Sequence, residues 1–271
     1  MKMTNFLYKD KTNCMQNLIK AGRAFYGIGV AGIGIQQFIY SEFRPVLLPY
    51  WPTSFPSPAI WAYIIGAALV LAGAIIILSR NARTVSILLG VLFFLLFLCF
   101  HVYYQLFLIP YDFHFGNWTN ALKELAFSGG AFVIASSFSE TRSFISNKTL
   151  LILGRIFFSI MLIVFGIDHF LYTDFVAPLV PDWIPGHIFW TYFGAVALIG
   201  SGICIMLKIK IRLVAMLLGT MLLLWFIILH IPRAIADPYE GKGNEITSVF
   251  QALAFSGIAF VIASSAWARK K

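Results

Sequence analysis

The sequence predicts an all-α membrane protein with eight transmembrane helices, arranged as two parallel repeats of one four-helix bundle. Three observations lead to this prediction. The 271-residue chain is 60% hydrophobic and only 11% charged, whereas about a quarter of the residues are charged in a typical soluble domain. Its apolar runs are about 20 residues long, enough to cross a hydrocarbon core roughly 30 Å thick. A segment near the middle of the chain also recurs almost unchanged near its end.

Short polar breaks separate the apolar runs. The runs cover residues 21–40, 59–79, 84–109, 119–138, 150–172, 186–207, 211–231 and 246–267. Each is expected to be helical, because a chain in hydrocarbon must satisfy its backbone hydrogen bonds internally. A single large soluble core is the alternative, but so many runs of spanning length argue against it. The lipid bilayer is therefore the first expected partner.

The basic residues predict how these spans are oriented. With the N-terminus in the cytoplasm, 16 of the 20 basic residues but only two of the 11 acids fall in the inner segments, 1–23, 79–84, 139–155, 206–212 and 268–271. Basic residues beside spans remain cytoplasmic because translocating them is unfavourable. Both termini are therefore expected in the cytoplasm. The net charge of +9 reflects this topology, and no nucleic-acid partner is expected.

The recurring segment defines an internal repeat. Residues 125–137 read LAFSGGAFVIASS and residues 253–265 read LAFSGIAFVIASS, so 12 of 13 positions agree at an offset of 128. The match extends upstream with small shifts, and Gly22 corresponds to Gly154. Because each unit has an even number of spans, the two copies share one orientation and are related by an axis along the membrane normal.

The repeat divides the chain into four segments. A cytoplasmic N-terminal segment is expected over 1–17, the first four-helix repeat over 18–138, a cytoplasmic linker over 139–149 and the second repeat over 150–271. Each repeat is expected to pack as a small bundle beside the other. Small residues four apart in several spans support this, since they let helix backbones approach closely in lipid.

The second repeat carries ionisable residues in the outer part of its spans. Asp168 and His169 lie in the fifth span, about 20 Å beyond its cytoplasmic end at ~1.5 Å per residue. His230 and Arg233 lie three residues apart in the seventh span and share much of one helix face. Ionisable groups near hydrocarbon are costly and suggest a function, so these four are the candidate catalytic residues. Structural pairing of helices and ligation of a metal or haem are the alternatives, although no metal-binding or nucleotide-binding motif is present.

The first repeat has fewer ionisable residues at this depth. Gln37 occupies the place of His169, and His101 occupies that of His230. Both are candidate ligand-binding residues. The second repeat, as the more ionisable copy, is the expected place of any site.

The outer loops that follow the first and fifth spans are rich in proline and tryptophan. They read RPVLLPYWP over 44–52 and APLVPDWIP over 177–185, which places Trp51 and Trp183 at corresponding positions. The two tryptophans form either part of an aromatic belt at the membrane interface or the roof of a pocket for a planar lipid such as a quinone. They are the remaining candidate ligand-binding residues, and a quinone is the cofactor that they suggest.

These residues resemble the pattern of the DoxX-like membrane proteins. The run GRIFFSIMLIVFGIDHFLYTDFVAPLVPDWIP (154–185), the Gly-rich span after it and HIPR (230–233) match the family's Gly-Arg opening, its polar or His-Phe closing position and its Val-Pro-x-Trp-x-Pro-type loop. The resemblance covers nearly the whole chain as two copies, and the first copy departs from it at 36–37 and 101–104. It implies a four-helix bundle in a bacterial inner membrane. Relatives include subunits associated with thiosulfate–quinone oxidoreduction and proteins needed to mature redox enzymes.

Three functions remain open. The first is a redox-linked subunit that binds a quinone or a sulfur species near the outer face, together with a redox partner in the membrane or the periplasm. The second is a non-catalytic scaffold or assembly factor, which the shortage of cofactor motifs favours. The third is a small-solute transporter, although no span is clearly broken by glycine or proline at mid-membrane. Whether the protein is an enzyme is also open.

Overall fold

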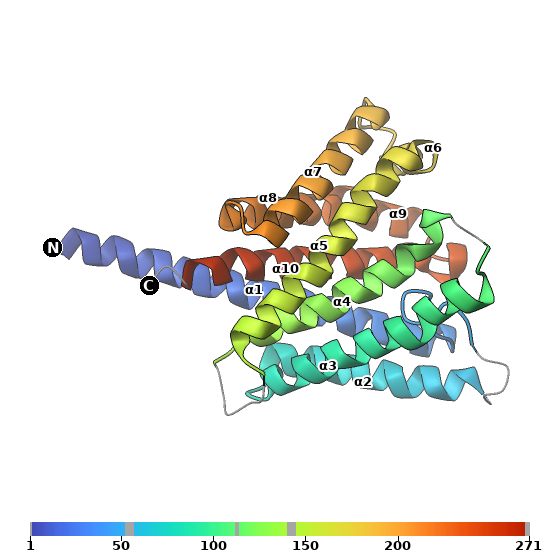
Figure 1. The fold of residues 1–271 in the computed structure, drawn as a ribbon, viewed down its shortest axis with the longest axis horizontal. Helices are drawn as coiled ribbons and strands as arrows, with labels where there is room; N and C mark the ends of the chain where they lie inside the picture. Colours follow the sequence, from blue (N-terminus) through green and yellow to red (C-terminus); the bar gives the residue numbers. More distant parts are fainter. Residues whose placement is uncertain (1, 52–56, 112–113, 140–144, 269–271) are drawn as a thin grey trace.

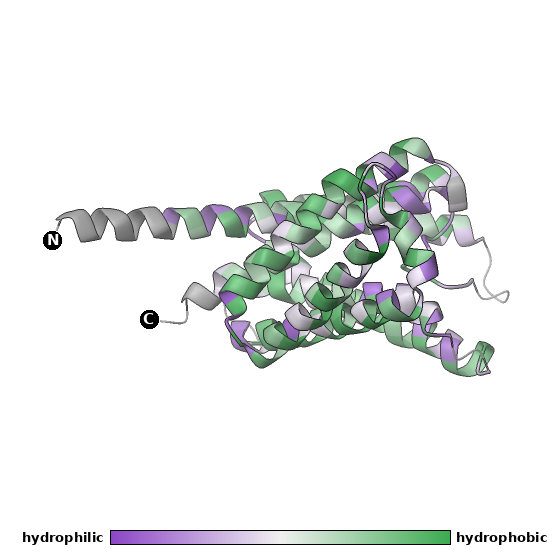
Figure 2. Cartoon of the chain, turned by 90° about the horizontal axis from the view of Figure 1, so that it is seen from above, coloured by the Kyte–Doolittle hydropathy of each residue, from purple (hydrophilic) through white to green (hydrophobic). Residues whose placement is uncertain are grey.

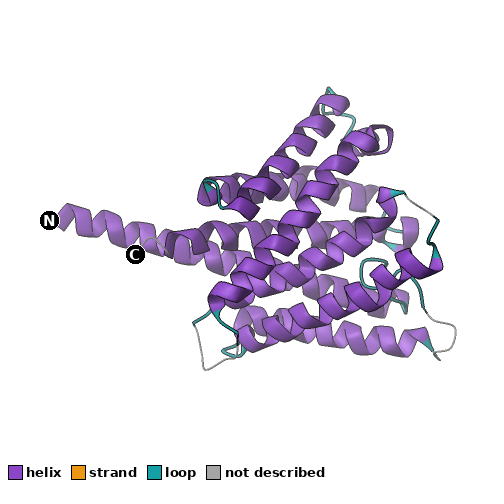
Figure 3. Ribbon diagram, in the orientation of Figure 1, coloured by secondary structure: helices purple, strands orange, loops and turns teal. Residues whose placement is uncertain are grey.

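The computed structural model describes residues 2–51, 57–111, 114–139 and 145–268, and within these ranges it contains helices and loops but no strand (Figure 1, Figure 3). Seven of the described helices are long and apolar enough to cross a membrane. They are α1 (Lys2–Tyr40), α2 (Pro58–Leu78), α3 (Ala82–Leu96) with its extension to Leu108, α5 (Asn147–Leu171), α7 (His187–Leu207), α8 (Ile211–Trp225) with its extension to Ala236, and α10 (Asn244–Ala268). This architecture is that of a polytopic membrane protein.

The remaining long helix, α4 (Thr119–Ser136), corresponds to the fourth predicted span. It is not among the seven, because Lys123, Glu124 and several serines and glycines make it less apolar. Its residues from Leu125 to Ala135 are all buried. A helix enclosed by other helices does not need a lipid-compatible surface, so its lower hydropathy follows from its central position. The count of eight spans remains a prediction.

Shorter helical segments connect the long helices. They are η1 (Phe97–Val102), η2 (Tyr104–Leu108), η3 (Phe115–Trp118), α6 (Thr173–Val176), η4 (Ala177–Leu179), η5 (Phe226–His230), α9 (Ile231–Ala236) and η6 (Glu240–Lys242). Because α1 begins at Lys2, the predicted N-terminal segment is part of the first helix. The centre of the predicted linker (140–144), Pro52 and the terminal basic residues 269–271 lie outside the described residues.

Large apolar side chains cover the outside of the bundle. The long helices are hydrophobic along most of their length, while hydrophilic residues gather toward the loops (Figure 2). Examples of such exposed side chains lie on α2, α3, α7 and α8, at Leu71, Leu88, Val196 and Leu217. On a folded protein, a large exposed apolar surface marks a place that contacts either a membrane or a partner protein. Here it indicates that a bilayer surrounds the helices.

Helices of the two sequence repeats interlock. Within each repeat the first helix packs on the second, as α1 does on α2 and α5 on α7. Yet α1 also packs along its length on α10, and α5 on α4 (Figure 1). The last helix of each repeat thus lies against the first helix of the other, and α4 also contacts α10. Contacts therefore run across the two repeats as well as within them.

Glycines allow these crossings. A Cβ atom on Gly22 of α1 would lie 2.6 Å from the carbonyl oxygen of Gly257 in α10, and one on Gly129 of α4 would lie 2.7 Å from that of Gly154 in α5. Real Cβ atoms do not approach a backbone oxygen so closely, so only glycine fits at these four positions. In lipid, close backbone packing replaces the hydrophobic drive that brings helices together in water.

A line of aromatic rings fills the centre between these crossings. Tyr26 packs on Phe127, Phe127 on Phe255 and Phe255 on Phe158, with ring centroids 6.2, 5.2 and 6.0 Å apart. The Tyr26 hydroxyl donates a hydrogen bond of 2.7 Å to the Phe127 carbonyl, so its polar atom is satisfied inside the core. The polar residues described below lie toward the N-terminal ends of α4 and α10.

Candidate functional site

His101 and His230, which belong to the third span of the first and second repeat, both lie in π-helical turns. His101 lies in η1, and His230 ends η5. In a π-turn the hydrogen bonds run from i to i+5, and such turns are rare and are often found at functional sites. Pro232 follows the second turn, and proline lacks the N–H that a regular helix needs at this point. The proline is a sequence signal for this turn, whereas the first repeat has no proline at the corresponding place.

The first polar group, called here the first-repeat cluster, consists of His101, Glu124, Gln105 and Asn117. The His101 Nε2 atom lies 3.3 Å from the Glu124 Oε2 atom and 3.2 Å from the Val46 carbonyl oxygen. Gln105, one turn after His101, donates from Nε2 to the Asn117 carbonyl at 2.8 Å. His101 and Glu124 are each 0% exposed. Glu124 was missed as a site residue because the sequence places it only at the outer end of a span.

The second polar group, called here the second-repeat cluster, consists of His230, Arg233, Glu245 and Lys123. The Arg233 guanidinium makes two bonds to the Glu245 carboxylate, from Nε at 3.1 Å and from Nη2 at 2.7 Å. His230 lies within electrostatic reach of Lys123, Glu245 and Arg233. Lys123 reaches toward α5, where its Nζ atom lies 5.8 Å from the Phe165 ring centre. Besides Arg233, Lys123 and His230 thus lie within electrostatic reach of the Glu245 carboxylate.

The two clusters meet at α4. Lys123 belongs to the second-repeat cluster and Glu124 to the first-repeat cluster. Neighbouring residues of an α-helix point about 100° apart, so one helix can contribute Lys123 to one cluster and Glu124 to the other. The corresponding residues of α10 are Gln251 and Ala252, which carry no charge. The two repeats are therefore unequal at this position.

Asp168 and His169 diverge from the second-repeat cluster. Asp168 is 8% exposed and interacts electrostatically with His114. The His114 ring in turn stacks on Tyr172, with ring centroids 4.3 Å apart. His169 turns toward α7, where its ring lies against Gly194, and its Nδ1 atom lies 2.6 Å from the Phe165 carbonyl. Of the four candidate catalytic residues, the structure brings together His230 and Arg233 and directs Asp168 and His169 to other partners.

The glutamines near the C-terminal end of α1 are buried near the start of α10. Gln36 donates to the Gly243 carbonyl at 3.0 Å and accepts from the Thr247 hydroxyl at 2.9 Å. The candidate Gln37 is 0% exposed. Arg44 in the following loop is also buried and donates to Thr247 at 3.3 Å. Burial lowers the pKa of the Arg44 guanidinium, while Tyr40 and Glu42 act in the opposite direction.

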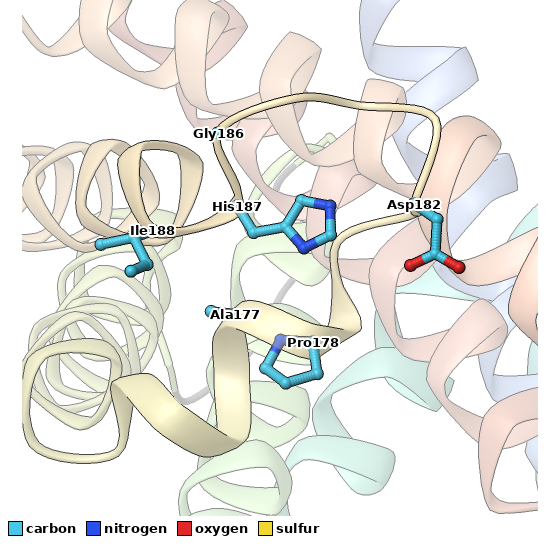
Figure 4. A pocket seen from close by; sticks show the side chains of 6 residues that line it. All are labelled: Ala177, Pro178, Asp182, Gly186, His187 and Ile188. Carbon is cyan, nitrogen blue, oxygen red and sulfur yellow. The ribbon is translucent and has the colours of Figure 1, made fainter.

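The two loop tryptophans have different surroundings. Trp51 stacks on Phe43 with ring centroids 5.5 Å apart, whereas Trp183 is 69% exposed. A surface hollow of about 510 Å³ lies beside the second loop (Figure 4), lined by Ala177, Pro178, Asp182, Gly186, His187 and Ile188. Trp183 is not among the lining residues. Its exposure fits a side chain in the membrane interface.

In the part of the chain that the structure describes, no group of three or more His, Cys, Asp or Glu side chains is placed to hold a metal ion. Comparison of the chain with protein-family models, with curated proteins and with solved structures gives no match. The second-repeat cluster is the strongest candidate for a binding site, because it joins a π-turn histidine to two cationic side chains.

Proposed function

We propose that the chain is a DoxX-like protein that crosses a bacterial inner membrane eight times, as two parallel four-helix repeats with both termini in the cytoplasm. Two features support this architecture. The 18-residue helix α4 coincides with the fourth predicted span, which supports counting it with the seven apolar helices. The Gly22–Gly257 and Gly154–Gly129 crossings correspond to each other, because the repeat alignment equates Gly22 with Gly154 and Gly257 with Gly129.

Cys14 offers a test of the orientation. Its side chain is exposed and can therefore react. Replacing Cys99 and Cys204 by serine leaves Cys14 as the only thiol of the chain. A membrane-impermeant maleimide is expected to label it only after the cells are permeabilised. A Tyr239→Cys variant on a cysteine-free background is the outer control, since this loop position is 84% exposed, and it should be labelled in intact cells. Labelling of Cys14 in intact cells would reverse the orientation.

The proposed function is to bind the head group of a quinone, or a sulfur oxyanion such as thiosulfate, as a redox-linked subunit. The observation that carries this proposal is the gathering of Lys123, His230 and Arg233 about Glu245. One carboxylate among three basic side chains leaves an excess of basic groups in this cluster. Quinone carbonyls and thiosulfate oxygens are the acceptors that such donors bind.

In this proposal each side chain has a definite task. Arg233 is held by its two bonds to Glu245, which fix the plane of its guanidinium group. Lys123 supplies a point charge from α4, and His230 supplies a ring nitrogen from the π-turn. A bound quinone would receive its electrons from the redox partner in the membrane or the periplasm, whereas a bound thiosulfate would give its electrons to that partner.

Binding measurements on the full chain in nanodiscs test the proposal. Lys123→Met and Arg233→Gln are each expected to weaken the binding of decylubiquinone or thiosulfate by about tenfold or more, because a hydrogen bond to a charged group contributes about 1.5–3 kcal/mol. The matched control is Lys242→Gln, which removes a cation from a surface pair with Glu42 and should change nothing. Absence of binding of both probes to the unaltered protein would refute the proposal.

A further inference from the structure

Glu124 of α4 is fully buried and has no hydrogen-bond donor beside it. Its side chain is 0% exposed, and within the described residues neither of its carboxyl oxygens has a hydrogen-bond partner. The His101 Nε2 atom lies 3.3 Å from Glu124 Oε2. That nitrogen is hydrogen-bonded to the Val46 carbonyl at 3.2 Å, and a carbonyl oxygen can only accept. The proton on Nε2 is therefore donated to Val46, not to Glu124.

No other basic side chain balances this acid. In the described part of the chain, no lysine or arginine nitrogen lies within 4 Å of a Glu124 oxygen. Lys123 precedes Glu124 on α4 but interacts with Glu245. A charged His101 ring would carry an N–H at Nδ1, an atom with no partner among the described residues, so the neutral ring is favoured. Buried charges in proteins are paired or coordinate a metal ion, and Glu124 lacks a pair.

The other unpartnered atoms of the first-repeat cluster are mostly acceptors. The neutral His101 ring has a lone pair at Nδ1. Gln105 Nε2 donates to the Asn117 carbonyl at 2.8 Å, which fixes the direction of the amide, and Gln105 Oε1 has no partner in the described protein. Against these acceptors and the Glu124 oxygens stands one unpartnered donor, Asn117 Nδ2. An excess of acceptors about a carboxylate favours a positively charged ligand.

The second repeat shows what this carboxylate lacks. Arg233 lies three residues after the histidine of that repeat and makes two bonds to Glu245. The corresponding residue of the first repeat is Tyr104, whose ring stacks on Tyr50 with ring centroids 5.3 Å apart. The acid of the second repeat thus has a cation built into the chain, whereas the acid of the first repeat must take one from solution.

We propose that the first-repeat cluster binds a monovalent alkali cation, sodium, through the Glu124 carboxylate, Gln105 Oε1 and the Val46 carbonyl. Hard cations prefer oxygen ligands of this kind. Glu124 Oε2 and the Val46 oxygen both border the His101 Nε2 atom, at 3.3 and 3.2 Å, and a carbonyl oxygen has a second lone pair for the ion. One carboxylate balances one positive charge, which favours sodium over a divalent ion.

The π-turns of the third span suit such a site. His101 lies in η1 and Gln105 in η2, where the helix departs from regular α geometry. In sodium-coupled transporters, irregular backbone within broken helices coordinates the ion. The site requires only one carboxylate and neutral oxygens, so it differs from a cluster of three or more acidic or histidine ligands. The proposal does not depend on the ligand of the second-repeat cluster.

Binding of radiolabelled sodium to the full chain in phosphatidylcholine nanodiscs tests the proposal, with choline chloride holding the ionic strength constant. Saturable binding is expected, displaced by unlabelled sodium but not by choline. Glu124→Gln should weaken it by about tenfold or more, because it removes the only charge that balances the ion. The control Glu42→Gln removes an exposed acid and should change nothing. Absence of saturable binding, which would mean that water alone solvates these atoms, or equal binding by Glu124→Gln would overturn the proposal.

Gln105→Leu keeps the proposal testable if Glu124→Gln does not fold. The thermal unfolding temperature of the unaltered chain is expected to rise with sodium, since a ligand of the folded state stabilises it. In Gln105→Leu the midpoint of that rise should move several-fold to higher sodium. The matched control is Gln251→Leu, which replaces a buried glutamine of α10 and should leave the midpoint unchanged. The same midpoint in Gln105→Leu and the unaltered chain, or an equal rise with choline, would contradict the site.

Discussion

Replacement of Gly22 by valine is expected to abolish most of the folded protein. The new Cβ atom would lie 2.6 Å from both the Gly257 carbonyl oxygen and the Val261 Cγ2 atom. The first of these is backbone, so relief requires α1 and α10 to move apart along their shared contact. Overpacking costs about 1–3 kcal/mol where side chains can adjust, and separating two helices lies at or above that range.

Gly200 provides the control for this substitution. It lies on α7, and a Cβ atom there meets nothing within 4 Å. Gly200→Val therefore tests the effect of adding the same side chain to a helix without a clash. Folded yield in mild detergent, measured by size-exclusion chromatography with thermal unfolding, should fall several-fold for Gly22→Val only. Equal yields of the two variants would show that the α1–α10 crossing is not needed for folding.

Loss of the Glu245 carboxylate should destabilise the protein far more than loss of the Glu42 carboxylate. Both acids form an ion pair of nearly equal length, 2.7 Å with Arg233 and 2.8 Å with Lys242. The side chains of the Arg233 pair are 29% and 17% exposed, whereas those of the Lys242 pair are 68% and 37% exposed. Burial is thus the main difference between them.

Glu245→Ala is expected to lower the free energy of unfolding by about 2–3 kcal/mol, somewhat less than the 3–5 kcal/mol for a fully buried pair. It leaves Lys123, Arg233 and His230 without their shared carboxylate. Glu42→Ala should cost less than about 1 kcal/mol, as surface pairs do. Denaturation in detergent compares the two variants directly. A similar loss in both would mean that the second-repeat cluster is hydrated and carries no special electrostatic role.

Most of the helices could be predicted from the sequence, because the bilayer imposes a simple rule on length and hydropathy. Seven predicted spans coincide with long apolar helices of the structure. α4 is also a helix where the fourth span is predicted, but Lys123 and Glu124 make it less apolar than the other seven, and neighbouring helices surround it. The partners of each helix were also beyond prediction, since Gly22 has no sequence feature that selects Gly257 over any other glycine.

The candidate site was only partly predictable, for a related reason. His230 and Arg233 were identified because they are ionisable and lie on one helix face. Their partners Lys123 and Glu245 come from two other helices, so they depend on tertiary packing. Glu124 shows the same limit more strongly, since a carboxylate at the end of a span looks like a loop charge until a histidine is found 3.3 Å away.

The interlocking of first and last helices has a consequence for biosynthesis. During translation α1 enters the membrane long before α10 has been made, so its glycine-lined face must wait for the end of the chain. A product that stops after the first repeat would leave the contact faces of α1 and α4 open. A second copy of the same product could cover both faces, since its own first and last helices carry the matching surfaces. The first repeat expressed alone is therefore expected to form a homodimer through the faces that α10 and α5 cover in the full chain.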